Sequence, residues 1–496
     1  MNKRQIRKIV ILGGGTAGWM TAAAVANRLP SQFYQIVLVE SEQIGTVGVG
    51  ESTIPHIRQF NETLGIDEAE FVRETNATFK LGIQFKHWGK SGESYIHPFG
   101  EVGELTNGID FHHYWLKAKS LGLTDSLDQY SFLAQAALEQ KFPEKAQLKG
   151  EKFSQYAYSY HIDATAYAGF LRKYAQNKGV TRIEGQVEQV CNSDKGDIES
   201  LVLQNGQRIY GDLFIDCSGF RALLIDDNLK VEFEDWTHWL PVNSAMVAQT
   251  ELTEAVYPMT IATAHKAGWA WKIPLQHRMG NGFVYDNHFM SDDEAGHLFS
   301  QHLNTKPINE PRILRFKTGV RSKLWHQNCI AIGLSGGFLE PLESTSIYLI
   351  QLGIFKFLEL FPHLEDMSAE QAEYNRIMQH SYQTIRDFII LHYHLNQKSD
   401  SEFWQRQQQM SLPESLQTRL AAFKESGRVE LGQFGVWSAV CIGQNLIPKR
   451  YDARLDWLAD SELMKFLSIQ KQQIEGAKTK LPTAAEYIKN LMKQGR

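Results

Sequence analysis

The sequence KIVILGGGTAGWMTAAAVANRLPSQFYQIVLVE, residues 8–40, decides the fold class. Its apolar start, Lys8–Leu12, predicts a short buried strand that ends at a run of glycines. The alanine-rich stretch Trp19–Leu29 predicts a helix, and Gln35–Val39 predicts a second strand that ends at Glu40. A strand, a glycine turn, a helix and a strand in this order predict a βαβ unit with parallel strands.

The turn between the first strand and the helix has the spacing GxGxxG of dinucleotide-binding proteins. In that arrangement Gly13 permits the tight turn, Gly15 lets the backbone approach a pyrophosphate, and Gly18 lets helix and strand pack closely. The helix N-terminus stabilises the anion, and Glu40 can accept hydrogen bonds from a ribose. A glycine-rich turn with a purely structural role is the alternative.

Composition limits the classes of function. The chain has 496 residues, of which 43% are hydrophobic and 22% charged, as in ordinary globular proteins. Because 51 basic residues stand against 56 acidic ones, no general basic field indicates nucleic-acid binding. The 4 cysteines are far apart and lack metal-type spacing, which is typical of reduced thiols in a cytosolic protein. No apolar run reaches the roughly 20 residues of a membrane span, so we expect a cytoplasmic protein without a membrane partner.

Further strand-to-glycine turns occur at Cys217-Ser218-Gly219 and at Gly333. Together with Gly13 they fit a flavoprotein body, in which an extended cofactor touches several loops. Residues 240–330 alternate aromatic and polar side chains and predict an antiparallel sheet, whereas the chain beyond Ile347 predicts amphipathic helices. We therefore predict an α/β, Rossmann-type FAD-binding body of the flavoprotein monooxygenase kind over residues 1–355 and a mainly helical, substrate-covering region over residues 356–496. Shorter segments predict helices at 56–78 and Asp163–Asn177 (with Asp163 as N-cap), strands near Phe79–Lys86 and at Thr181–Val190, Glu199–Leu203 and Asp212–Ile215, and a hairpin turn at Asn205-Gly206.

A series of longer motifs runs in order through the chain. They are GGGTAGWM (13–20), GVGESTIP (48–55), TFKLGIQF (78–85), HPFG (97–100), HIDATAYAGFLR (161–172), GWAWKIPL (268–275) and GGFLEPLESTS (336–346). In this order they resemble the flavin-dependent halogenases of the tryptophan halogenase type, over nearly the whole chain. Trp269, Trp271 and Ile273 form the most diagnostic segment, because in that family it accompanies halogenation rather than ordinary flavin oxygenation.

The resemblance implies the cofactor and the partners. Reduced FAD, supplied by a separate flavin reductase, reacts with oxygen, and chloride or bromide becomes hypohalous acid, which halogenates a small electron-rich aromatic substrate. No nucleic-acid or membrane partner is implied, and both a monomer and a homodimer stay open. The residues expected to bind FAD are Gly13, Gly15, Thr16, Ala17, Gly18, Glu40, Gly50, Ser52, Val187 and Gly333.

Two residues match the catalytic pair of the family. Lys80 matches its lysine, whose ammonium can hydrogen-bond hypohalous acid and whose neutral amine could form a haloamine. Glu343 matches its glutamate, which stabilises the cationic ring intermediate and accepts its proton. Lys80 could instead be a surface lysine. Glu340 competes with Glu343, and both glutamates could merely cap the following helix.

The same resemblance assigns the neighbouring positions. Thr345 and Ser346 match residues whose backbone amides hold the halide, although the family commonly has glycine in place of Ser346. Trp269, Trp271 and Ile273 are expected to shape and shield the site, or to be ordinary core residues on one strand face. A last set, His97, Pro98 and Phe99, matches the substrate-stacking segment, with a structural loop histidine as the alternative.

The chain departs from the family in Phe423–Pro448. The family carries a tyrosine pair, a glutamate and a Phe-Trp pair there, which clamp free tryptophan. This stretch has no Tyr-Tyr and no Phe-Trp; its nearest aromatics are Phe434 and Trp437, and its nearest acids are Glu425 and Glu430. A site without partners for the ammonium and carboxylate of tryptophan cannot gain their binding energy. We therefore expect a less polar, indole-type substrate, bound in part by Trp437, with a phenolic or pyrrole-like ring and a carrier- or peptide-bound aromatic as further alternatives. A flavin monooxygenase and a non-catalytic flavin-binding protein are the alternative functions.

Overall fold

The computed structural model describes residues 5–44, 50–123, 125–144, 148, 153, 156–253, 256–303, 305–428 and 436–494. The chain folds into two compact units, each made of three separate segments. The first unit comprises Met1–Asn76, Ile162–His238 and Phe316–Gln383, and the second comprises Ala77–His161, Trp239–Arg315 and Thr384–Arg496. The predicted boundary at residue 355 divides the chain by function, whereas these units divide it by contacts, so the boundary stays a prediction.

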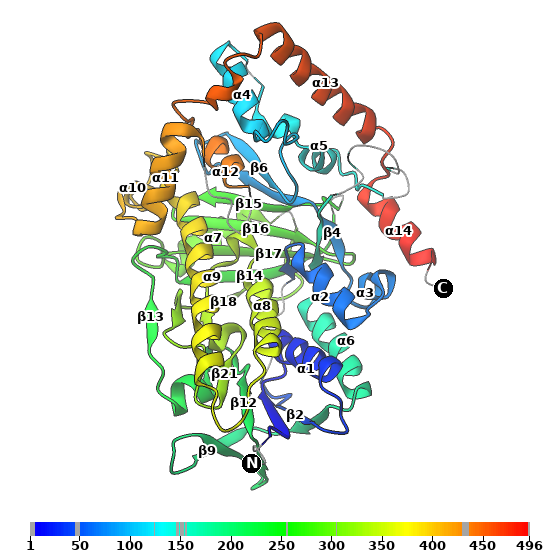
Figure 1. Ribbon diagram of the computed structural model, residues 1–496, viewed down its shortest axis with the longest axis vertical. Coiled ribbons are helices and arrows are strands. Elements are labelled where there is room, and N and C mark those ends of the chain that lie inside the picture. Colours follow the sequence, from blue (N-terminus) through cyan, green and yellow to red (C-terminus); the bar gives the residue numbers. More distant parts are fainter. Residues whose placement is uncertain are drawn as a thin grey trace. The chain divides into compact units, whose positions relative to one another are not determined.

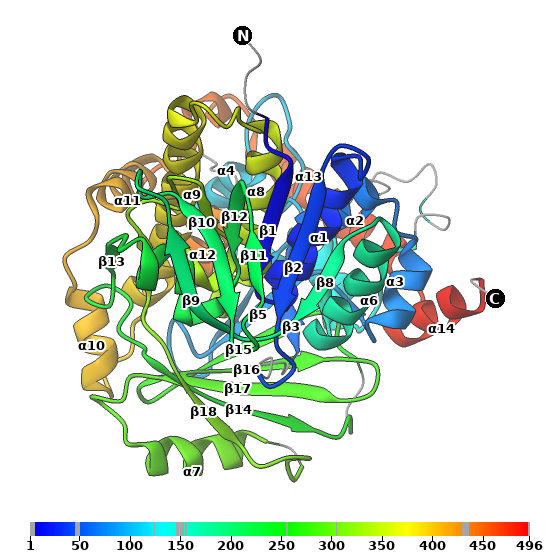
Figure 2. The ribbon, with the colours of Figure 1, turned by 90° about the horizontal axis from the view of Figure 1, so that it is seen from below.

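The first unit is built around a six-stranded sheet in the order β20-β21-β12-β1-β2-β8 (Figure 2). Its central strands run parallel, with Val10 opposite both Val37 and Phe214. Residues on both faces of β1 are buried, as expected for a parallel sheet covered on both sides. The bounds of these elements are β1 (Lys8–Leu12), β2 (Gln35–Glu40), β8 (Thr181–Glu184), β12 (Leu213–Asp216), β20 (Trp325–His326) and β21 (Cys329–Ala331), with the helices α1 (Thr16–Arg28) and α6 (Ala164–Asn177) packed against each other.

The predicted βαβ unit is confirmed, with one difference in its helix. Helix α1 begins at Thr16 rather than Trp19, so Gly18 lies inside its first turn. Asp163 caps α6 as predicted, because its carboxylate accepts hydrogen bonds from the backbone N–H groups of Thr165 and Ala166. The hairpin turn at Asn205-Gly206 is also present and joins two antiparallel strands of a small sheet. That sheet consists of β9 (Val187–Asn192), β10 (Ile198–Leu203) and β11 (Arg208–Tyr210).

The prediction that residues 56–78 are largely helical is confirmed, with one break between two helices. The chain forms α2 (His56–Leu64) and α3 (Glu68–Glu74), since Gly65 ends the first in the left-handed conformation, with φ 70°, and Asp67 caps the second. The other elements of the first unit are β3 (Glu51–Ser52), η2 (Gly219–Arg221), η3 (Leu223–Asn228), β13 (Phe233–Asp235), β19 (Gly319–Arg321), η4 (Gly333–Ser335), β22 (Gly337–Phe338), η5 (Pro341–Glu343) and α8 (Ser346–Glu359).

The second unit contains the predicted antiparallel sheet, which has seven strands in the order β18-β14-β17-β16-β15-β5-β6 (Figure 1). All neighbours in it pair antiparallel except β15 and β5, which run parallel. The predicted strand near Phe79–Lys86 is divided at Leu81 into β4 and β5. The seven strands are β5 (Gly82–Lys86), β6 (Ser94–Pro98), β14 (Ser244–Thr250), β15 (Thr260–His265), β16 (Gly268–Pro274), β17 (Met279–Tyr285) and β18 (Arg312–Arg315). Strands β4 (Thr78–Lys80) and β7 (Ser159–Ile162) belong to a separate three-stranded sheet with β3.

The described C-terminal part of the chain is mainly helical, which confirms that part of the predicted fold class. Helix α9 (Ser368–His394) contributes residues to both units. Among the described residues, no helix combines the length and the apolarity that crossing a membrane requires. The helices of the second unit are α4 (Phe111–Ser120), η1 (Leu127–Tyr130), α5 (Phe132–Leu138), α7 (Asp292–His302), α10 (Glu402–Gln409), α11 (Glu414–Ser426), α12 (Trp437–Gly443), η6 (Ala453–Leu455), α13 (Asp460–Lys478) and α14 (Ala484–Gln494).

Candidate active site

The glycine turn of the first unit leaves no space for side chains. Gly13 has φ +112°, and a Cβ atom there would lie 2.2 Å from the carbonyl oxygen of Cys217. A Cβ atom on Gly18 would lie 1.8 Å from the carbonyl oxygen of Gly13. The N-cap residue of α1, Gly15, supplies no side-chain cap, and the first turn holds no acidic residue. Its N–H groups are therefore open to an anion such as a pyrophosphate.

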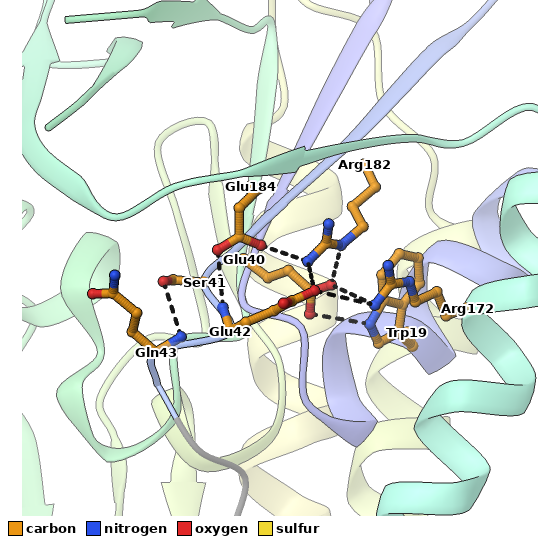
Figure 3. A network of polar contacts seen from close by, with 8 residues as sticks. All are labelled: Trp19, Glu40, Ser41, Glu42, Gln43, Arg172, Arg182 and Glu184. Atoms are coloured by element: carbon orange, nitrogen blue, oxygen red, sulfur yellow. Dashed lines mark hydrogen bonds and ion pairs between the residues drawn. The ribbon is translucent and has the colours of Figure 1, made fainter. Parts of the chain in front are cut away.

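Glu40 lies at the carboxyl end of β2 and takes part in a network of charges (Figure 3). Its Oε1 accepts a hydrogen bond from Arg182 Nε at 2.5 Å, and Trp19 Nε1 donates to its Oε2 at 3.4 Å. Arg172 is an ion-pair partner at 3.7 Å, and the Glu40 side chain is only 13% exposed. A carboxylate offers about four acceptor positions, so Glu40 retains capacity for the hydroxyls of a ribose.

Other predicted FAD-binding residues lie at different distances from this turn. Gly333 is close to it, because a Cβ on Gly333 would lie 2.9 Å from the Cβ of Ala17. Gly50 is buried just before β3, and Ser52 is buried within that strand. Val187 begins β9 and packs against the hydrophobic core, so its proposed contact with the cofactor stays a prediction. The turn, the open helix end and Glu40 fit a dinucleotide such as FAD.

Glu51, between Gly50 and Ser52, is a residue that the sequence analysis did not single out. Desolvation by burial raises the pKa of its carboxyl to about 7. A carboxyl in this state can hold or release a proton near neutral pH, which makes it notable within a predicted cofactor site. Its motif GVGESTIP offered the only signal, and Gly48 of that motif lies outside the described residues.

Helix α8 of the first unit begins at Ser346, three residues after Glu343. Glu343, Ser344 and Thr345 are each 3% exposed, and Ser344 is in the left-handed conformation with φ 60°. The helix has no side-chain cap and no acidic residue in its first turn, so neither Glu340 nor Glu343 acts as the cap considered from the sequence. Among the described residues, Thr345 Oγ1 is buried without a hydrogen-bond partner. A helix start of this kind suits a small anion held by backbone N–H groups, as predicted for Thr345 and Ser346.

In the second unit, Lys80 is completely buried on β4, with 0% of its surface exposed, so the surface-lysine alternative is wrong. Its Nζ lies over the ring of Phe99, 4.8 Å from the ring centre. The backbone fixes this pair, because the N–H of Phe99 donates to the carbonyl oxygen of Leu81 at 2.9 Å. A buried ammonium on an aromatic face gains cation–π stabilisation but loses hydration.

The predicted stacking residue His97 lies on β6 beside Pro98. Its ring contacts Phe388 edge-on at 5.4 Å, and Phe388 in turn packs on Trp437 at 4.9 Å. His97 Nε2 accepts a hydrogen bond from the N–H of Val436 at 3.1 Å. The second unit thus joins Lys80 to Phe99 and His97 to Trp437. The sequence analysis missed Phe388, because nothing in the pattern of α9 distinguishes it from an ordinary core residue.

The tryptophans of the diagnostic segment lie on β16. Trp269, Trp271 and Ile273 are 1%, 6% and 5% exposed, and the two indole rings are 5.6 Å apart. A Cβ on Gly282 would lie 1.9 Å from the ring of Trp271, so that ring lies directly over the neighbouring strand. Their rigid packing is compatible both with shaping a site and with a plain core role.

The region that departs from the family is only partly described. Phe434 and Glu430 lie outside the described residues. Glu425 lies on α11, exposed, and forms an ion pair with Lys449 at 2.6 Å. Trp437 is 1% exposed, and the guanidinium of Arg419 lies 5.1 Å from its ring centre. Within the described part of this stretch, no acid is positioned beside Trp437 to hold an ammonium group.

Comparison with known proteins identifies the family. The family model described as tryptophan halogenase matches residues 8–460. The chain belongs to the tryptophan halogenase family. It is a flavin-dependent halogenase, as the motifs predicted, and the two alternative functions are set aside.

Individual relatives agree with this assignment. The halogenase is 35% identical to tryptophan 6-halogenase SttH of Streptomyces toxytricini over 449 residues, which are 86% of this chain and 85% of that protein. Among solved structures, the flavin-dependent halogenase Xcc4156 of Xanthomonas campestris matches with a TM-score of 0.94 and 44% identity, covering 98% of this chain and 99% of that one. BrvH, a flavin-dependent halogenase of Brevundimonas sp. BAL3, matches with a TM-score of 0.94, 40% identity and the same coverage. These matches span both units, so the predicted α/β flavoprotein fold is confirmed.

Proposed function

We propose that this halogenase uses FADH2 from a separate flavin reductase, oxygen and chloride or bromide to make hypohalous acid, and that it halogenates an indole-type ring rather than free tryptophan. The observation that carries the proposal is the complete burial of Lys80 against the face of Phe99. Burying an ammonium costs free energy unless it is paired and hydrogen-bonded, and buried titratable groups are concentrated at functional sites, which makes Lys80 a candidate for a chemical role.

Lys80 acts on the hypohalous acid. As an ammonium it donates a hydrogen bond to the oxygen of hypohalous acid, which makes the halogen more electrophilic. As an amine it can attack the halogen, so that an N–halogen bond forms, the oxygen–halogen bond breaks, and hydroxide leaves with an amine proton as water. The Phe99 ring contacts the Lys80 Nζ, and the complete burial of Lys80 keeps bulk water away from it.

Glu343 acts on the ring. Electrophilic attack gives a cationic intermediate, which a carboxylate stabilises and deprotonates to restore aromaticity. Glu343 is buried, so its charge is weakly screened and its effect on a nearby cation is large. Glu343 belongs to the first unit and Lys80 to the second.

FAD and the halide would be held by the first unit. The open N-terminus of α1 would hold the pyrophosphate, and Glu40 would bind the ribose. The bound cofactor supplies the electrons that reduce oxygen. The N–H groups at Thr345 and Ser346 would hold chloride or bromide.

The substrate assignment rests on the residues that the stretch Phe423–Pro448 lacks, namely the Tyr-Tyr and Phe-Trp pairs. Tryptophan carries an ammonium and a carboxylate, and a site that leaves them unpaired loses affinity for the charged amino acid. The aromatic residues His97, Phe388 and Trp437 can stack on an indole ring without charged partners.

Lys80→Ala tests the catalytic assignment. We expect halogenated product to fall by roughly 100-fold or more, because oxidant is no longer delivered to the ring, while FAD binding and oxygen consumption persist. Mass spectrometry of indole incubated with a flavin reductase, NADH, FAD and bromide measures the product. The matched control is Lys119→Ala, since the Lys119 ammonium also lies over a ring, that of Trp115, at 5.0 Å. A fully active Lys80→Ala variant contradicts the proposal.

The substrate preference has its own measurement. Indole is expected to turn over at least roughly tenfold faster than free tryptophan at equal concentration, because tryptophan must leave its charges unpaired. Parallel reactions with chloride and with bromide, each with a halide-free control, give the ratio from the isotope patterns of the products. Faster turnover of tryptophan would overturn the indole assignment but not the halogenase.

A further inference from the structure

Residues from three of the motifs meet at one buried hydroxyl in the second unit. Thr78, two residues before Lys80 on β4, donates its Oγ1 proton to the carbonyl oxygen of Pro274 at 2.6 Å. The same oxygen lies 3.1 Å from His161 Nδ1, and His161 Nε2 lies 2.9 Å from Thr260 Oγ1. Thr78 and His161 are 0% exposed. The chain of contacts therefore joins the strand of Lys80 to the end of the strand that carries Trp269 and Trp271.

These contacts fix the tautomer of His161. A threonine hydroxyl has a single proton, and that of Thr78 is used on Pro274, so Thr78 Oγ1 must accept from His161 Nδ1–H. In a neutral imidazole Nε2 then carries no proton and accepts from the hydroxyl of Thr260. Desolvation by burial, and after it the charge of Lys80, lower the pKa of His161 well below its ordinary value, so the ring is neutral.

The register of the strands places this histidine on the strand next to that of Lys80. Strands β4 and β7 pair antiparallel, with Thr78 opposite His161 and Lys80 opposite Ser159. Side chains two residues apart on a strand point to the same face, so Thr78 and Lys80 leave β4 on one side. A shift of Thr78 therefore moves the base of the Lys80 side chain with it.

We propose that His161 is a positioning residue for the halogenation step: as the neutral Nδ1–H tautomer it holds Thr78 on Pro274 and so fixes where Lys80 presents its amine. The role of Lys80 on which this rests belongs to the proposed function. Pro274, at the end of the strand that carries Trp269 and Trp271, takes part as well, since its carbonyl oxygen accepts the hydrogen bond from Thr78 on β4. Because the His161 ring is uncharged, it places no positive charge next to Lys80.

The test compares variants that keep or remove one contact. His161→Leu removes both hydrogen bonds at similar volume, whereas His161→Asn retains a side-chain N–H near the Nδ1 position. Since a displaced catalytic group can lose about 100-fold in rate, we expect His161→Leu to lower kcat for indole by roughly 10- to 100-fold with KM for indole little changed. His161→Asn should recover most of that loss. Oxygen consumption and FAD affinity should stay at the level of the unaltered protein in both.

Thr78→Val gives an independent measurement if His161→Leu does not fold. It removes the bonds to Pro274 and to His161 without changing the shape, and we expect the same fall in kcat. The matched control is Thr75→Val, because Thr75 is also 0% exposed and donates to a backbone carbonyl, that of Phe71, at 2.7 Å. Thr75→Val should leave kcat unchanged.

The outcomes separate this inference from the proposed function. If Lys80→Ala is inactive while Thr78→Val and every folded His161 variant keep full kcat, the positioning role is wrong and the proposed function stands. If His161→Leu and His161→Asn fall equally, or if KM rises in step with the fall in kcat, the inference is also overturned. A fully active Lys80→Ala variant defeats the proposed function and this inference with it.

Discussion

At the scale of single residues, Glu40 shows how a charged side chain can be held in one orientation to accept hydrogen bonds from neutral hydroxyl groups. Arg182 fixes one of its oxygens at 2.5 Å, and Trp19 reaches the other at 3.4 Å (Figure 3). Two acceptor positions directed by a cation and an indole keep the carboxylate from swinging away from the glycine turn. A ribose diol would then meet a preoriented acceptor, which lowers the entropic loss on binding.

Glu40→Gln should therefore weaken FAD binding. Hydrogen bonds to a charged acceptor contribute about 1.5–3 kcal/mol, so the dissociation constant for FAD should rise roughly 10- to 100-fold. Quenching of flavin fluorescence on titration measures it. Glu42→Gln is the matched control, since Glu42 is 72% exposed and binds the same Arg182 at 2.9 Å. An equal loss in both variants would show that the charge network, and not contact with the ribose, supports FAD binding.

At the scale of elements, those set by neighbouring residues could be predicted from the sequence, and those set by distant residues could not. The βαβ unit and the Asp163 cap could be predicted because strand, turn and cap signals lie within a few residues of each other. The break between α2 and α3 was missed although Gly65 and Asp67 mark it, since the apolar pattern continues across both. The contacts of Thr78 could not be predicted, because its partners are 83 and 196 residues away in the chain.

The candidate site divides in the same way. Family motifs indicated Lys80, Phe99 and His97, and the second unit brings Lys80 against Phe99. They gave no information on Phe388, whose ring joins His97 to Trp437, because an aromatic residue on a long helix resembles core packing. Motifs thus identify the residues that carry chemistry, whereas the side chains that position them come from tertiary contacts alone.

At the scale of the whole molecule, the response to acid depends on histidines that the fold keeps neutral. Desolvation by burial, with help from nearby cations, lowers the pKa of His265 to about 4 and that of His302 to about 3. Their rings lie 5.5 Å apart, so a proton on one raises the free energy of a proton on the other. His113 is a third, its pKa lowered to about 4 mainly by burial and then by His112.

The sign of the effect follows from where the protons bind. Between pH 6.5 and pH 4 the unfolded chain protonates these histidines and the folded protein does not, so the unfolded state binds more protons and stability falls as the pH falls. Each histidine adds at most about 1.4 kcal/mol per pH unit to the slope of unfolding free energy against pH. Paired carboxylates act in a lower window, because Arg454 first, and then Arg428, hold the pKa of Asp452 below its ordinary value of 3.8.

Urea unfolding at a series of pH values from 7.5 to 4.5 should therefore show a steep loss of stability well above the window of the carboxylates. His302→Gln removes one proton-binding group while keeping a polar side chain of similar length, and it should flatten the slope by up to about 1.4 kcal/mol per pH unit. His363→Gln, at an exposed position, is the control and should leave the slope unchanged. A slope that is the same in all three proteins would mean that His302 is protonated equally in the folded and unfolded chain, contrary to its burial.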